Sequence, residues 1–141
     1  MSNEGCFQKQ DNVRNEFKAL MSEEDKYEKI IQLGRALSPL EERFKIEENI
    51  VTGCQSKMFL HSFLKEGKVY FEVYSDALIS AGLAALLLSV YNGESPETVL
   101  TCPPNYLEDL GISTSLTPSR ANGLYSVHLK KAFGGFFQIH R

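Results

Sequence analysis

The feature that most constrains the fold is a strongly apolar segment over residues 77–91. In the helix that this segment predicts, apolar side chains lie nearly all round the axis, so other parts of the chain have to cover it. Asn92 and Gly93 end it in the manner of a glycine C-terminus, and Ser75 and Asp76 precede it as candidate caps. Its apolar run is far shorter than the roughly 20 residues that cross a bilayer. We therefore expect a core helix packed against a sheet.

The strands of that sheet are predicted just before the helix. Residues 57–64 and 68–74 are strand candidates, and Glu66-Gly67 between them is a turn signal, which predicts an antiparallel hairpin. Alternation of apolar and other side chains over 69–74 is typical of a half-buried strand. Residues 49–52 form a third candidate. The fold class is therefore α+β: a small antiparallel sheet of about three strands packed against several helices in a single domain.

Further helices are predicted on both sides of this unit, over residues 23–37, 96–100, 106–110 and 117–133. The first should end at Ser38-Pro39, because the residue before proline is pushed out of the helical region. The charged stretch 40–49 reads either as a solvated connection or as an acidic docking surface. Residues 1–22 form a polar N-terminal extension with a short helix near 17–21 after a loose start, residues 23–133 form the domain, and residues 134–141 form an unassigned tail.

Charge and cysteine content exclude several classes of function. The net charge of −3 and pI near 5.6 give no electrostatic reason to expect nucleic acid or a membrane surface as partner. Cys6, Cys54 and Cys102 are an odd number of widely separated cysteines without zinc-site spacing. With no secretory signal at the N-terminus, a reducing cytoplasm fits best. We expect no bound metal and no cofactor.

One cysteine stands in a context that presents its thiol. Cys54 follows Gly53, which permits a tight turn at the end of a β-branched run, and is followed by the small polar pair Gln55 and Ser56. Such a thiol is reachable by another molecule, although a free cysteine is more often a small buried hydrophobe. Cys6, in a terminus expected to be mobile, and Cys102, in a loop, are interpreted as incidental. The lone histidines are interpreted as surface or core residues: His61, His128 and His140.

Four separated motifs together resemble the SufE family. They occur in order as Asp25-Lys26-Tyr27 with Leu33-Gly34, then residues 51–56, then Ser75-Asp76-Ala77 with Gly82-Leu83, then residues 116–124. The resemblance covers about residues 23–133. It implies that Cys54 is the sulfur-accepting cysteine, on a loop between the first two strands, with Gly53, Gln55 and Ser56 as supporting neighbours. Asp76 matches the acidic residue that opens the long helix, and Arg120 matches the arginine of the last motif. Phe59 stands where the family usually has a tryptophan.

The resemblance implies a sulfur carrier rather than an enzyme. Such a protein takes persulfide sulfur from a cysteine desulfurase (SufS-like), stimulates that pyridoxal-phosphate enzyme, and passes the sulfur to an iron–sulfur scaffold (SufB-like). The alternative is an iron–sulfur or zinc-binding scaffold of the related fold, which would need clustered thiolate or imidazole ligands. A cysteine–histidine hydrolase lacks an identifiable orienting pair. Arg120 could supply charge to the site or brace loops through carboxylates such as Asp76, and Asp76 could simply cap its helix.

Overall fold

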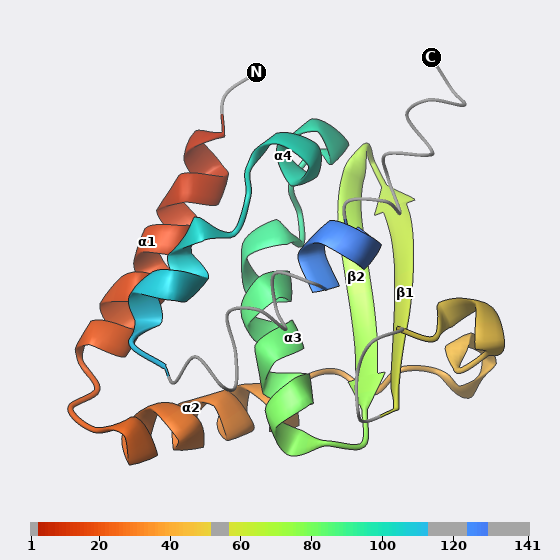
Figure 1. The fold of residues 1–141 in the computed structure, drawn as a ribbon. Helices are drawn as coiled ribbons and strands as arrows, with labels where there is room; N and C mark the ends of the chain where they lie inside the picture. The colour runs from red at the N-terminus through yellow and green to blue at the C-terminus, as the bar shows by residue number, and fades with distance from the viewer. Residues whose placement is uncertain (1–2, 52–56, 113–123, 130–141) are drawn as a thin grey trace.

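A computed structural model describes residues 3–51, 57–112 and 124–129 of the chain. The central element is the apolar helix α3 (Leu78–Tyr91), which lies between a two-stranded sheet and the N-terminal helices (Figure 1). Its bounds agree with the helix predicted over 77–91, and nearly all of its side chains beyond the first turn are buried. Among the described helices, none is both long and apolar enough to cross a membrane.

The sheet is an antiparallel hairpin of β1 (Met58–Lys65) and β2 (Lys68–Ser75), as predicted. At the turn, Glu66 and Gly67 both have positive φ, 53° and 77°. Two-residue turns of this left-handed kind match the twist of the strands that they join. The alternation expected in the second strand also holds, because Val69, Phe71 and Val73 are buried on the face that packs on α3.

The expected third strand is not formed in the described residues. Ile50 makes only an isolated bridge to Phe59, and the Val51 N–H donates to the Met58 carbonyl at 2.9 Å. The 3-10 helix η2 (Glu47–Asn49) occupies the residues just before, so extended backbone begins only at Ile50. The α+β class is confirmed, with a sheet of two strands in place of about three. The charged stretch 40–49 also contains a second short 3-10 helix, η1 (Glu42–Phe44).

Helix α2 (Glu23–Arg35) crosses α3 closely at two glycines. Ser22 caps its start, with Oγ accepting from the Asp25 N–H at 3.1 Å. A Cβ atom on Gly82 would lie only 2.1 Å from the Ile30 carbonyl oxygen, and one on Gly34 would lie 2.8 Å from the Gly82 nitrogen. The two backbones can approach this closely only without side chains there. The helix ends at Arg35, slightly before the predicted stop.

The N-terminal extension is a full helix, α1 (Glu4–Lys18), rather than a loose segment with a short helix near 17–21. It packs on α3 and on the 3-10 helix η3 (Asn105–Leu110). Arg14 pairs there with Asp109 at 2.8 Å. Its buried side chains recur at helical spacing: Cys6, Gln10, Val13 and Phe17. The expectation of a weakly ordered start was wrong, because this face joins the core.

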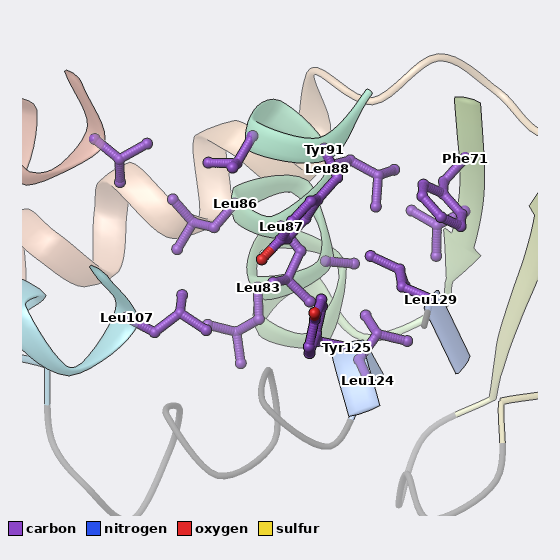
Figure 2. Close-up of a cluster of buried hydrophobic side chains, with 14 of the residues drawn as sticks. Phe71, Leu83, Leu86, Leu87, Leu88, Tyr91, Leu107, Leu124, Tyr125 and Leu129 are labelled. Atoms are coloured by element: carbon purple, nitrogen blue, oxygen red, sulfur yellow. The ribbon is translucent and has the colours of Figure 1, made fainter. Parts of the chain in front are cut away.

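The C-terminal part of the described chain closes the core over α3. Helix α4 (Pro96–Thr101) begins with proline in its first turn, as expected, and Ser95 caps it. Of the helix predicted over 117–133, only η4 (Leu124–Leu129), a π-helix, lies within the described residues. Its side chains Leu124, Tyr125 and Leu129 are buried against α3 (Figure 2), where the Tyr91 and Tyr125 rings stack at 5.3 Å. The tail 134–141 lies outside the described residues.

Candidate functional site

The segment that carries Cys54 is bounded by two well-placed anchors. Gly53, Cys54, Gln55 and Ser56 themselves lie outside the described residues. Before them, the buried Val51 is hydrogen-bonded to Met58 at the start of β1. After them, the Lys57 carbonyl accepts from the Asp76 N–H at 3.4 Å. The segment therefore leaves and returns at the sheet end where β1 begins and β2 finishes.

Asp76 lies between β2 and α3, next to Lys57, the first described residue after this segment. Its side chain is exposed, and its backbone adjoins Lys57. The expectation that Asp76 caps the helix was wrong: the N-cap is Ala77, without a side-chain cap, and the Ala77 N–H donates to Ser75 Oγ at 3.2 Å. Helix capping therefore does not account for this carboxylate. An exposed carboxylate and the exposed Lys57 thus lie where the Cys54 segment returns to the sheet.

Two exposed apolar side chains belong to the same end of the sheet. Leu78, in the first turn of α3, is 47% exposed, and Ile50, beside the start of β1, is 38% exposed. Sequence reasoning missed both: the apolar helix that contains Leu78 was expected to be buried throughout, and Ile50 was placed in the expected third strand. The α2 backbone does reach the first turn of α3, where a Cβ atom on Gly34 would lie 3.0 Å from the Leu78 carbonyl oxygen, but the Leu78 side chain is left exposed. Exposed apolar side chains of this kind are suited to contacting another protein.

Of the other two expected site residues, the structure describes Phe59 but not Arg120. Phe59, at the family's tryptophan position, is 6% exposed and lies against Tyr74, with ring centroids 6.3 Å apart. Phenylalanine therefore retains an apolar contact there, without the indole N–H donor of tryptophan. Arg120 lies outside the described residues, so its proposed relation to Asp76 remains a prediction.

Cys6 and Cys102 are withdrawn from solvent and lie against each other. Both are 0% exposed, and their sulfur atoms are 2.6 Å apart. Burial raises the pKa of both thiols, so both stay protonated near neutral pH. The expectation that Cys6 belongs to a mobile terminus was wrong, because it is on the buried face of α1. Neither thiol can meet a donor on another protein in this conformation.

The described histidine serves packing. The His61 ring stacks on Phe44, with centroids 3.6 Å apart. The His128 side chain and His140 fall outside the described parts of the chain. Across the described ranges, no three side chains of His, Cys, Asp and Glu gather closely enough to hold a metal ion.

Comparison with known proteins assigns most of the chain to one family. Residues 11–131 match the family model described as "SufE: Fe-S metabolism associated domain". An uncharacterized SufE-like protein of Synechocystis is 40% identical over 102 residues, covering 72% of this chain and 64% of that protein. The "SufE-like protein 1, chloroplastic/mitochondrial" of Arabidopsis thaliana is 37% identical over 112 residues, 79% of this chain but 30% of that protein. The matched part of this chain thus spans less than two thirds of the length of either relative.

A solved structure has the same fold. The solution structure of a hypothetical protein from Thermus thermophilus superposes with a TM-score of 0.72 at 26% identity, covering 92% of this chain and 96% of that one. The family match spans most of the chain and includes the motifs around Cys54, Asp76 and Arg120. The chain therefore belongs to the SufE family and carries a domain associated with iron–sulfur metabolism.

Proposed function

We propose that this chain is a sulfur carrier in which Cys54 accepts sulfur from a cysteine desulfurase and passes it to an iron–sulfur scaffold. One observation carries the proposal: Cys6 and Cys102 are buried against each other. Of the three cysteines, Cys54 is thereby left for exchange with another protein, in the family motif and between two anchored chain ends. Membership of the SufE family supports a SufS-like donor and a SufB-like acceptor.

The transfer needs no oxidant and no bound cofactor on this chain. The Cys54 thiolate attacks the outer sulfur of the persulfide on the donor cysteine. A sulfur–sulfur bond forms to Cys54 while the donor's sulfur–sulfur bond breaks, and the donor cysteine leaves as a thiolate. The proton that Cys54 gave up goes to that thiolate or to solvent. A second exchange of the same kind then moves the sulfur to a thiol of the scaffold and restores Cys54.

Docking makes such a transfer fast, because holding two reactants together replaces a slow bimolecular encounter. Leu78 and Ile50 supply exposed apolar contact area at the end of the sheet where β1 begins. We assign Asp76 and Arg120 to positioning, Asp76 because its side chain is exposed and its backbone N–H bonds to Lys57, the residue that follows the Cys54 segment. Both are proposed to organise the loops that meet the desulfurase.

A reducing compartment suits an acceptor thiol. We propose the cytoplasm, as the sequence indicated. The Arabidopsis relative is named as chloroplastic/mitochondrial. Localisation of this chain by microscopy tests the proposal, and its presence in an organelle would contradict it.

The test is stimulation of a desulfurase. Sulfide release from cysteine is measured under excess reductant, with the desulfurase encoded in the same genome, with and without this chain. We expect faster turnover with the chain, no turnover by the chain alone, and loss of the acceleration in Cys54→Ser. Cys102→Ser is the matched control and should accelerate as the wild type does. Absence of both acceleration and a detectable complex would refute the carrier function.

A further inference from the structure

Cys6 and Cys102, the two buried cysteines that the proposed sulfur transfer does not use, lie in contact with each other and are surrounded by specific hydrogen bonds. Cys6 lies in the first turn of α1, and Cys102, 96 positions later, is the C-cap residue directly after α4. Both side chains are fully buried, with their sulfur atoms in contact at 2.6 Å. The contact joins the start of the N-terminal helix to the chain that directly follows α4.

A buried amide is directed at this pair. Gln10 is only 2% exposed, although a buried amide costs free energy unless it is hydrogen-bonded. Its Nε2 lies 3.5 Å from Cys102 Sγ, 3.8 Å from Cys6 Sγ and 3.1 Å from the Pro103 carbonyl oxygen. Sulfur accepts such bonds as a thiol and equally as a disulfide, because its lone pairs remain. The amide therefore suits both redox states.

The backbone on each side of the pair is also held. The Tyr91 hydroxyl donates to the Cys102 carbonyl at 2.5 Å, and both residues are fully buried. Near Cys6, Asn3 exchanges side-chain hydrogen bonds with Thr98 and Thr101 of α4, at 3.0 and 3.1 Å. Neither cysteine has to travel far to bond with the other, because both chain segments are already fixed where they meet.

We propose that Cys6 and Cys102 form an intramolecular disulfide under peroxide, fastening α1 to the core while leaving Cys54 as the remaining thiol. One cysteine sulfur attacks the peroxide O–O bond, becoming a sulfenic acid and releasing one water. The second sulfur attacks the sulfenic sulfur and expels its oxygen as a second water. Two thiols and one hydrogen peroxide thus become one disulfide and two waters, with the thiol protons carried away in the water.

Burial decides the rate of this step and the persistence of its product. A protonated thiol without solvent contact reacts slowly, so oxidation requires transient opening of the first turn of α1. Once formed, the disulfide is equally shielded from external thiols. The disulfide therefore forms only under sustained oxidation and persists afterwards. Cys54 differs, because it has to accept and release sulfur rapidly.

The test uses Cys54→Ser, which removes the acceptor thiol, and Cys54→Ser/Cys102→Ala as the matched control. Each is treated with hydrogen peroxide while folded, then quenched, unfolded and alkylated. Trypsin separates the three cysteines into peptides 1–9, 46–57 and 69–120. A sample of Cys54→Ser oxidised in urea shows that the reagent is active, and the wild-type chain run in parallel shows the same pair with Cys54 present.

We expect Cys54→Ser to lose both alkylatable thiols and about two mass units, the two thiol hydrogens. Peptides 1–9 and 69–120 should be linked, dithiothreitol should release them, and the thermal midpoint should rise. The control should keep Cys6 alkylatable or add oxygen to it, without a link. The proposal is overturned if both cysteines stay alkylatable in folded Cys54→Ser, if they gain oxygen without linking, if the link joins two chains, or if Cys54 of the wild type links to either.

Discussion

Replacing Gly82 by alanine tests whether α2 and α3 really cross in backbone contact. A Cβ atom there would lie 2.1 Å from the Ile30 carbonyl oxygen and 2.4 Å from its Cγ2. Non-bonded carbon atoms prefer about 3.5–4.0 Å, so the helices would have to separate by roughly 1 Å or more. Backbone cannot rotate away as a flexible side chain can.

The magnitude follows from two opposing effects. Overpacking of this kind lowers the free energy of unfolding by about 3 kcal/mol, the upper end of its usual range. Alanine in place of glycine inside a helix raises it by about 1 kcal/mol. The net loss in the free energy of unfolding is therefore about 2 kcal/mol, or roughly 5–10 °C in the thermal midpoint of a domain of this size.

The assay is thermal and urea unfolding followed by circular dichroism, with Gly5→Ala as the matched control. A Cβ atom on Gly5 would meet only the Glu94 carboxylate at 3.6 Å, an ordinary contact. We expect that control to unfold at or slightly above the wild-type temperature. A Gly82→Ala protein as stable as the wild type, or a Gly5→Ala protein destabilised to the same extent, would refute the close helix crossing.

Three further predictions concern stability. Ser22→Ala should lose about 1 kcal/mol, because the Asp25 N–H loses its cap, and Ser22→Asp should restore most of that in urea unfolding. Tyr91→Phe should lose about 1–3 kcal/mol by leaving the Cys102 carbonyl buried without its donor, which thermal unfolding would register; no change would contradict that hydrogen bond. The raised pKa of Cys6 makes stability pH-dependent: in the unfolded chain thiols ionise above about pH 8.5, whereas the folded thiol keeps its proton. Stability is therefore complete below that pH and falls above it, and a flat profile of unfolding free energy between about pH 7.5 and 9.5 would contradict the burial.

Local patterns predicted the hairpin and the central helix because both arise from neighbouring residues. The period of two over 69–74, the Glu66-Gly67 turn and the apolar run of α3 each act within a few positions. The short β-branched stretch at 49–52 was a weaker signal, and η2 takes up the residues that would have lengthened it. A strand that short depends on its surroundings more than on its own sequence.

Helix α1 was predicted too short because its buried face includes residues that are not read as apolar. Cys6, Gln10, Val13 and Phe17 follow helical spacing, but a glutamine in the series hides the pattern. The contact between Cys6 and Cys102 has no local signal at all, since 96 positions separate them. For the site, the motif around Cys54 predicted the acceptor residue, which stays a prediction, whereas the exposure of Leu78 became visible only when the packing was known.

The most direct test of the carrier function is the location of transferred sulfur. The chain is incubated with a cysteine desulfurase and cysteine, separated without reductant, and analysed by intact and tryptic-peptide mass spectrometry. We predict the added mass of one or more sulfur atoms on peptide 46–57, which contains Cys54, and its absence in Cys54→Ser. Added sulfur on peptide 1–9 or 69–120, or an unmodified chain beside an active desulfurase, would contradict the account.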